Sequence, residues 1–351
     1  MKVRRVNAVV PIASIILSLL ALEVGLRAYT GRWEYDNLRD PSKADYIFST
    51  PVSFDAELGW VPRGDAQAKN TILDDGTRSN GSGEVRDASK PILAVGDSFT
   101  FGTEVSDWET WPAQLEELSG IRVINAGVVA YDIDQAFLRA RRLLSRYRFS
   151  TVIFGFIPDD VRYSQMWGWM KPYFDFKDGK LTLENVPIRP PSKKSDLLIA
   201  LEHSQVVHSV MKRLFPNWWL DGSIQVQDGE KGLEVSCAML HELEELTKTL
   251  GARLIVFVEY HDDSFSSTAV EGKVSRVLNC LSDPATRIFD LKLALSELKA
   301  KDVSRYSGLN MPPQRWAHMT AEGNRFVALE ILKILTHGST QVDRGLLLPA
   351  H

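Results

Sequence analysis

From Lys90 onward, short apolar runs alternate with longer amphipathic segments, and this alternation constrains the fold more than any other feature. The runs of strand length are KPILAV, RVIN, TVIFGF, RLIVFV and RIFDL. The segments of helical spacing are DWETWPAQLEELSG, YDIDQAFLRARRLLSRY, VSCAMLHELEELTKTLG, VSRVLNCLSD and MTAEGNRFVALEILKIL. Strands that alternate with helices predict an α/β domain, with a parallel sheet covered by helices on both faces.

Polar residues follow several of these runs at the point where each predicted strand ends. They are Asp97-Ser98, Asn125-Ala126-Gly127, Asp159-Asp160 and His261-Asp262-Asp263. Ligands of parallel sheets bind beyond the carboxyl ends of the strands. The sequence therefore predicts a functional site at this edge of the sheet.

Ser98, in AVGDSFTFG, is the candidate nucleophile of that site. A serine hydroxyl attacks well only when a base removes its proton, and His318, directly before the last predicted helix, is the best candidate base. Acyl transfer also needs N–H donors for the oxyanion, and the backbone N–H groups of Ser98 and Gly127 are candidates. Taken alone, each residue has a structural alternative: Ser98 as a helix cap, and His318 as a surface or capping histidine.

Four motifs together resemble the SGNH (GDSL-type) hydrolase family, and more closely its membrane-anchored bacterial members. They are GDSFTFG, EVSDWETWPAQLEEL, VINAGVVAYDIDQ and HMTAEGN, in family order over residues 90 to 336. The resemblance implies that Ser98 is the nucleophile, that Gly127 is an oxyanion donor and that His318 is the base. It also implies a flavodoxin-like three-layer α/β/α sandwich.

The sequence departs from the family pattern at two places. Asp159 stands where the family has an Asn that donates to the oxyanion, and an ionised carboxylate cannot donate. Either burial keeps Asp159 protonated, or the oxyanion hole uses two backbone donors. The family also carries an Asp shortly before the His, whereas this chain has Arg315 and Trp316 there. The remaining candidates for the acid that orients His318 are Asp262, Asp263 and Asp290; without one, the site is a Ser-His dyad.

An apolar run from Ala8 to Leu22 predicts a single-pass membrane anchor. Basic residues precede it: Lys2, Arg4 and Arg5. Counted through Leu26, about 20 residues are available to cross a hydrocarbon core of ~30 Å, with Glu23 near the far interface. The basic flank predicts a cytoplasmic N-terminus and an exported remainder, which for a bacterial member means the inner membrane and the periplasm. A cleaved signal peptide is the main alternative, and a soluble helix is weaker.

The chain of 351 residues divides into a basic flank and anchor at 1–31, a polar linker at 32–89, the hydrolase-like domain at 90–338 and a tail at 339–351. The sequence leaves open whether 32–89 packs on the domain. An insertion at about 161–230 is expected to contain a small hairpin and helices, and to lie over the strand ends as a lid. Its aromatic residues either stack on sugar rings or form the core of the insertion: Trp167, Trp169, Tyr173 and Phe174.

Charge and cysteine usage exclude other classes of function. The net charge is −4, so the composition gives no sign of the basic surface that binds nucleic acid. Cys237 and Cys280 show no zinc spacing, and they are either a disulfide or two free thiols. We expect no cofactor; a cation site formed by Asp97, Asp159 and Asp160 is a weaker alternative.

These observations predict an exported serine esterase that acts on O-acyl groups, acetyl above all, of a cell-surface carbohydrate. The predicted partners are this acylated carbohydrate and the membrane, which the protein contacts through its N-terminal helix. One alternative is a polysaccharide O-acetyltransferase that uses the same acyl-enzyme. The other is a degenerate member that binds a polysaccharide or an envelope protein without turnover.

Overall fold

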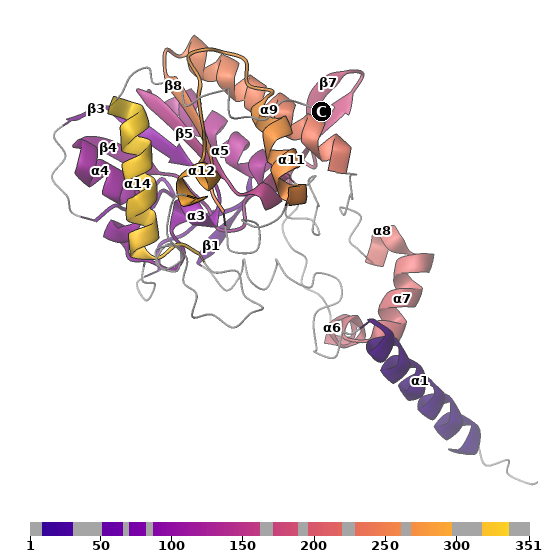
Figure 1. The fold of residues 1–351 in the computed structure, drawn as a ribbon. Helices are drawn as coiled ribbons and strands as arrows, with labels where there is room; N and C mark the ends of the chain where they lie inside the picture. Colours follow the sequence, from indigo (N-terminus) through magenta and orange to yellow (C-terminus); the bar gives the residue numbers. More distant parts are fainter. Residues whose placement is uncertain are drawn as a thin grey trace, which may run out of the picture.

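A five-stranded parallel sheet forms the centre of the protein (Figure 1). The computed structural model describes residues 9–30, 51–65, 70–81, 87–161, 171–188, 196–219, 229–260, 268–296 and 318–336. The strands are β3 (Asp87–Val95), β4 (Ile121–Asn125), β5 (Thr151–Phe156), β8 (Arg253–Val258) and β9 (Arg287–Asp290). They are ordered β4-β3-β5-β8-β9, and every neighbouring pair is parallel. This is the flavodoxin-like order, so the predicted fold class is confirmed.

Helices cover both faces of the sheet and complete three layers (Figure 1). On one face, α4 (Trp111–Ser119) packs against α14 (Ala321–Thr336). On the other face, α5 (Ile133–Arg146) packs against α9 (Gly229–Thr249), which also contacts α11 (Thr268–Leu278). The shorter elements are α3 (Ser98–Phe101), η1 (Asp107–Glu109), η2 (Pro158–Val161) and α12 (Leu291–Ser296).

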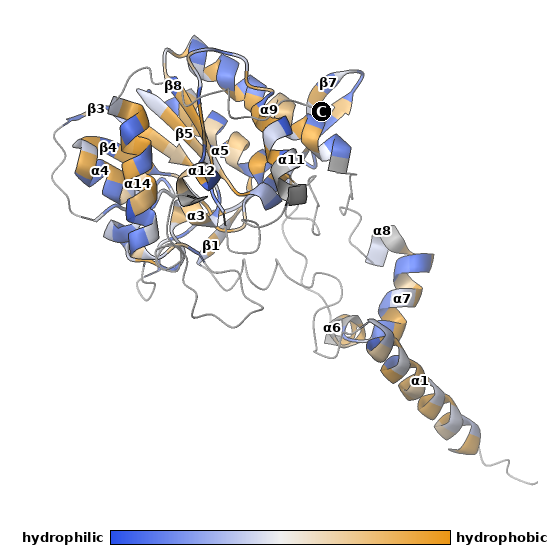
Figure 2. Ribbon diagram, in the orientation of Figure 1, coloured by the Kyte–Doolittle hydropathy of each residue, from blue (hydrophilic) through white to orange (hydrophobic). Residues whose placement is uncertain are grey.

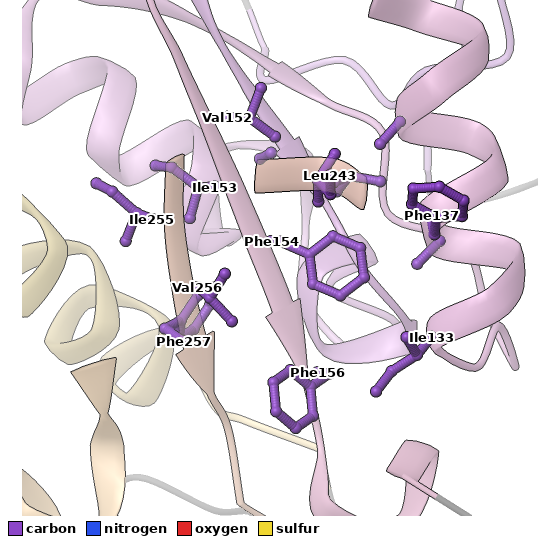
Figure 3. Close-up of a cluster of buried hydrophobic side chains, with 14 of the residues drawn as sticks. Ile133, Phe137, Val152, Ile153, Phe154, Phe156, Leu243, Ile255, Val256 and Phe257 are labelled. Atoms are coloured by element: carbon purple, nitrogen blue, oxygen red, sulfur yellow. The ribbon is translucent and has the colours of Figure 1, made fainter. Parts of the chain in front are cut away.

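The core is built around β5, whose six residues are all buried. Successive side chains of a strand point to opposite faces, so an unbroken apolar run suits a strand covered on both sides. Figure 3 shows Phe154 and Phe156 turned towards Ile133 and Phe137 of α5. The candidate site at the carboxyl ends of the strands is therefore supported by a fully buried central strand.

Part of the segment predicted as a polar linker is folded against the domain. A hairpin joins β1 (Val52–Asp55) to β2 (Gly59–Pro62), and the buried Trp60 indole donates to the carbonyl of Val129 at 3.0 Å. Further along, Arg78 N–H donates to the carbonyl of Asn125 at the end of β4, at 2.8 Å. The described parts of 32–89 are thus attached to the domain, which answers the question that the sequence left open.

The insertion contains the expected hairpin, β6 (Tyr173–Lys177) and β7 (Lys180–Glu184), which is antiparallel. The hairpin contacts α5 and α9 in the helical layer, away from α3 at the carboxyl end of the sheet (Figure 1). The lid prediction is therefore wrong for this part of the insertion. Tyr173 and Phe174 are buried, so they serve as core and not as a sugar platform; Trp167 and Trp169 lie outside the described residues.

The predicted helical part of the insertion consists of α6 (Asp196–Glu202), α7 (Gln205–Leu214) and α8 (Pro216–Trp219). These helices lie beside the N-terminal helix, apart from the sheet (Figure 1). They are the second reason for rejecting the lid, because the longest described stretch of the insertion does not approach the strand ends.

The expected apolar helix at the N-terminus is present as α1 (Val9–Thr30). Its residues Val10–Thr30 are long and apolar enough to cross a membrane, and none of that window is buried inside the protein (Figure 2). A membrane anchor and a signal sequence both fit this helix by length and composition.

Cys237 of α9 and Cys280, just after α11, form a disulfide with a Cα–Cα distance of 5.6 Å. The sequence left the state of these cysteines open. The bond ties together two helices of one layer and closes a loop with a sequence separation of 43 residues.

Replacing both cysteines (Cys237→Ser with Cys280→Ser) is expected to lower the free energy of unfolding. For a loop of this length, the chain-entropy model gives an upper value of about 4 kcal/mol. Guanidinium unfolding of the full chain in detergent measures the change. A reductant should destabilise the wild type by a similar amount and leave the double variant unaffected. An unchanged unfolding midpoint in the double variant would contradict the bond's contribution.

Candidate active site

The structure brings Ser98 and His318 into hydrogen-bond contact, although 220 residues separate them. Ser98 is the first residue of α3, directly beyond β3, and His318 lies just before α14. Ser98 Oγ and His318 Nε2 are 2.8 Å apart. This is the distance at which an imidazole nitrogen accepts a hydroxyl proton.

A carboxylate on the other side of the imidazole completes the arrangement, and it belongs to Glu104. His318 Nδ1 lies 3.1 Å from Glu104 Oε1. Because an ionised carboxylate can only accept, this bond places the ring proton on Nδ1 and leaves Nε2 free to accept from Ser98. The site therefore contains a Ser-His-Glu chain and not a dyad.

The sequence interpretation missed Glu104 and looked for the acid elsewhere. Asp290 accepts the backbone N–H of Lys292 at 2.9 Å, in the turn after β9. Asp262 and Asp263 lie outside the described residues. The available signal was proximity: Glu104 stands six residues after Ser98, in the loop that α3 leads into.

Glu104 has the electrostatic state that this role needs. The hydrogen bond from His318 lowers the pKa of Glu104 below its usual range, while partial burial acts in the opposite direction. The side chain is 33% exposed, so water also reaches it. Glu104 is thus a carboxylate at neutral pH, able to stabilise a positive imidazolium.

The turn that carries Ser98 is shaped by its neighbours. Asp97 caps α3, and its Oδ1 accepts the N–H of Phe99 at 2.8 Å. A Cβ at Gly96 would lie 2.4 Å from Thr100 Oγ1, so only glycine fits there. The N–H of Ser98 donates to no partner within the described residues, as expected for the first turn of a helix. It remains available as an oxyanion donor.

The predicted second donor, Gly127, is arranged differently from expectation. Its N–H donates to the side chain of Asn125 at 3.1 Å, so it is engaged within its own turn. The glycine is required for another reason, because a Cβ would lie 2.3 Å from the backbone N of Phe101. To donate to an oxyanion, this N–H has to give up its hydrogen bond to the Asn125 side chain or divide it between the two acceptors.

Asp159 and Asp160 both lie in η2, beyond the carboxyl end of β5. Asp160 is buried, and its Oδ2 accepts the N–H of Ile157 at 3.2 Å. Asp159 is half-buried. Its predicted place in the oxyanion hole stays a prediction.

His318 is held by the start of α14, which is bonded to the start of α4. Asn324 Oδ1 accepts the N–H of Trp111 at 2.8 Å, and Gln114 Nε2 donates to the carbonyl of Ala321 at 3.0 Å. His318 itself is only 9% exposed, and its ring packs against Phe99 with 5.0 Å between centroids. These contacts place the imidazole directly above the α3 turn.

Two buried carboxyl groups lie beneath the nucleophile turn. Burial raises the pKa of Asp97 to about 6, and it raises the pKa of Glu259 well above its usual range, with the charge of Asp97 as a second cause. Glu259 follows β8, and its Oε1 is 3.3 Å from the hydroxyl of Thr100. Sequence reasoning did not single out Glu259, since it continues an apolar strand.

Within the residues that the structure describes, no group of three or more His, Cys, Asp or Glu side chains is arranged to hold a metal ion.

No model of a known protein family and no curated protein sequence matches this chain. Among solved structures, it is similar to the lipase/acylhydrolase from Enterococcus faecalis, with 12% identity, 72% of this chain and 99% of that chain covered, and a TM-score of 0.42. It is also similar to a catalytic mutant of an acetylxylan esterase from Geobacillus stearothermophilus, with 12% identity, coverage of 71% and 95%, and a TM-score of 0.41. A salicylyl-acyltransferase from a tetracycline biosynthetic pathway is similar at 12% identity, coverage of 71% and 57%, and a TM-score of 0.39. At this level of similarity, the function has to be inferred from the residues of this chain.

Replacing Glu259 (Glu259→Gln) is expected to flatten the dependence of stability on pH. Because the pKa of Glu259 is raised, the folded protein keeps a proton that the unfolded chain releases above pH ~4.3. The free energy of unfolding then falls as pH rises, by up to about 1.4 kcal/mol per pH unit. Asp97 contributes in the same direction, but only up to about pH 6.

Denaturant unfolding between pH 6 and pH 8.5 isolates the contribution of Glu259. The wild type should lose stability across this range, and the Glu259→Gln variant should lose much less. Glu117→Gln is the matched control, because this glutamate is exposed and pairs with Arg325 on the surface. Parallel curves for the wild type and Glu259→Gln would contradict the prediction.

Proposed function

We propose that this protein is a serine esterase. The observation that supports this function is the continuous chain of hydrogen bonds from Ser98 Oγ through the His318 ring to Glu104, with distances of 2.8 and 3.1 Å. Such a chain pairs a nucleophile with a base and the base with an orienting acid. Its position at the carboxyl end of a flavodoxin-like sheet suits a ligand site.

In the proposed first step, Ser98 Oγ attacks the carbonyl carbon of an ester while His318 Nε2 takes the hydroxyl proton. Glu104 keeps the imidazole in the required tautomer and stabilises the charge that the ring gains. The tetrahedral intermediate then collapses: the bond to the alcohol breaks, and His318 returns its proton to the leaving oxygen. The product of this half-reaction is an acyl group on Ser98.

In the second step, His318 Nε2 takes a proton from water, which attacks the acyl carbon. The bond to Ser98 Oγ then breaks, His318 returns the proton to that oxygen, and the acid is released. The N–H of Ser98 is the donor available to the oxyanion in both steps. Loss of one donor from such a site typically costs ~10²–10³ in rate. The engaged N–H of Gly127 thus points to a slower enzyme than one with a complete oxyanion hole.

We also propose that α1 is a retained anchor. Glu23, within this apolar helix, accepts three hydrogen bonds from the start of α7 and one from Arg27. The donors are Ser204 Oγ of the N-cap of α7 at 2.8 Å, Gln205 N–H at 2.9 Å and Val206 N–H at 3.0 Å. These partners suit a helix that stays attached, because removal of α1 would leave the start of α7 without its acceptor.

An exported domain is supported by two features. Basic residues precede α1, which favours a cytoplasmic N-terminus and an extracytoplasmic remainder. The Cys237–Cys280 disulfide is typical of an oxidising compartment. We therefore propose a domain on the periplasmic side of a bacterial inner membrane. O-acylated carbohydrates of the cell surface are the esters that it would meet there, and they are the substrates to test first.

The proposed function is tested by intact mass after exposure of the full chain to a fluorophosphonate. We expect one adduct on the wild type, none on Ser98→Ala, and a labelling rate lowered by ~10²–10⁴ in His318→Ala and Glu104→Ala. Release of acetate from acetylated saccharides then tests hydrolysis. Transfer of the acetyl group to a hydroxyl of an added saccharide would instead identify an acyltransferase.

No adduct on a folded wild type would contradict the esterase. Saccharide binding that is unchanged in Ser98→Ala would then identify a binding protein without turnover.

Retention of α1 is tested on protein purified from bacterial membranes through a C-terminal tag. We expect an intact mass that includes α1 and a protein that stays with the membrane fraction after a high-salt wash. A soluble product whose mass begins beyond Thr30 would show that the segment is a cleaved signal peptide.

A further inference from the structure

We propose that Arg78 is a positioning residue that places Glu104 against His318. This inference rests on the proposed function, and it assigns a role in the site to a segment outside the predicted hydrolase-like domain. Arg78 lies between 70 and 81, in the stretch whose composition predicts only a linker.

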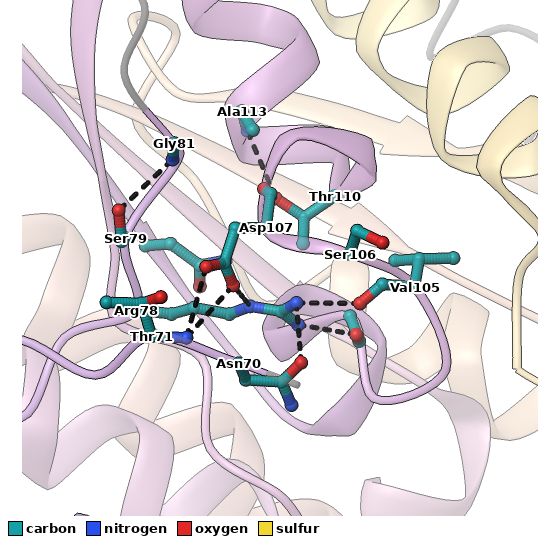
Figure 4. Close-up of polar contacts among 12 residues, drawn as sticks. Asn70, Thr71, Arg78, Ser79, Gly81, Val105, Ser106, Asp107, Thr110 and Ala113 are labelled. Carbon is teal, nitrogen blue, oxygen red and sulfur yellow. Dashed lines mark hydrogen bonds and ion pairs between the residues drawn. The ribbon is translucent and has the colours of Figure 1, made fainter. Parts of the chain in front are cut away.

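The guanidinium of Arg78 uses all of its donor groups on one small region (Figure 4). The acceptors are Asp107 Oδ1 at 2.9 Å, Asn70 Oδ1 at 2.9 Å and the carbonyls of Phe101, Gly102 and Val105 at 2.7, 2.5 and 2.7 Å. An arginine has five N–H groups in a planar fork, so this set saturates it. Three of the five bonds go to backbone carbonyls of a single turn.

That turn carries Glu104. The carbonyls of Gly102 and Val105 stand on either side of Glu104 in the chain, and Arg78 holds both. On its nucleophile side, the same turn is bonded to Ser98, whose carbonyl accepts the N–H of Gly102 at 2.9 Å. Arg78 therefore fixes the backbone that sets the distance from the nucleophile to the acid.

The turn has little freedom to adjust in other ways. Gly102 has a φ of 81°, in the left-handed region that favours glycine. A Cβ added there would lie 2.5 Å from Thr110 Cγ2 and 3.2 Å from an Nη atom of Arg78. The guanidinium thus fills the space behind the turn and also bonds to it.

Burial explains why arginine is needed here. The side chain of Arg78 is 0% exposed, and its charge is balanced by Asp107, whose side chain is 10% exposed. The backbone of Arg78 is fixed independently, since its N–H donates to Asn125 at 2.8 Å. A lysine keeps the charge but has three donors on one nitrogen, and it cannot reach acceptors spread along the turn.

Glu104 depends on this support because its carboxylate is one-third exposed. A side chain at the surface does not hold its own position by packing. A displacement of about 1 Å in a catalytic group typically costs ~10²-fold in rate. Loss of the Arg78 contacts should therefore weaken the Glu104–His318 bond without removing either residue.

The experiment compares fluorophosphonate labelling rates of Ser98 in the full chain for the wild type, Arg78→Lys, Glu104→Ala and the double variant. We expect Arg78→Lys to lower the rate by ~10–10²-fold in the wild-type background. In the Glu104→Ala background, it should lower the rate no further, because Arg78 acts through Glu104. Arg142→Lys is the matched control: this arginine also makes several side-chain bonds, but to Asp55 and Glu57, away from the site.

The outcomes separate this inference from the proposed function. A wild type that is not labelled overturns the esterase itself. A labelled wild type with an unchanged rate in Arg78→Lys overturns the role of Arg78. An equal fall in both backgrounds also overturns it, because a general loss of structure would act independently of Glu104.

A second variant covers the case in which Arg78→Lys does not fold, as judged by its thermal unfolding. Asp107→Asn keeps Arg78 and its carbonyl acceptors, but it removes the charge that holds the guanidinium in place. Its labelling rate should fall in the wild-type background and not in the Glu104→Ala background. The same fall in both backgrounds, or no fall in either, would overturn the proposal.

Discussion

The site depends on the junction between the starts of α4 and α14, which a hydrogen bond between distant parts of the chain holds together. Trp111 N–H, at the start of α4, donates to the side chain of Asn324 in the first turn of α14, and 213 residues separate the two. The bond fixes the beginnings of these two helices relative to each other. His318 just precedes α14, and the turn of Ser98 leads into α4, so the distance between base and nucleophile depends on this junction.

The elements of the sheet were predictable because their sequence pattern has one physical meaning. A run such as TVIFGF is too short for a helix and has no polar residue after Thr151, which suits a strand covered on both faces. The contact between Ser98 and His318 was predictable for a similar reason, since Ser98 follows the strand β3 and His318 precedes the helix α14. By contrast, the length of the insertion says nothing about where it folds, and Phe174 packs on α5 where a lid was expected.

Glu104 and Arg78 could not be predicted by the same reasoning. The contact of Glu104 with His318 depends on the shape of a turn, and that shape depends on side-chain bonds from a loop earlier in the chain. The turn-rich segment that carries Arg78 has no hydrophobic periodicity, so its sequence does not predict which part of the fold it contacts. The same is true of Gly127: the sequence indicated that a glycine is needed there, but it did not predict that the N–H of this glycine donates to the side chain of Asn125.

The proposed acid and the proposed nucleophile lie on the same short stretch of chain, from Ser98 to Glu104, whereas the family that the sequence resembles places its acid beside the histidine. In this protein, the histidine is therefore the isolated member of the three. A movement of α14 would withdraw the base alone and leave Ser98 and Glu104 assembled. The proposed reactivity therefore depends on the packing of α14 on α4, which Asn324 and Gln114 hold through hydrogen bonds.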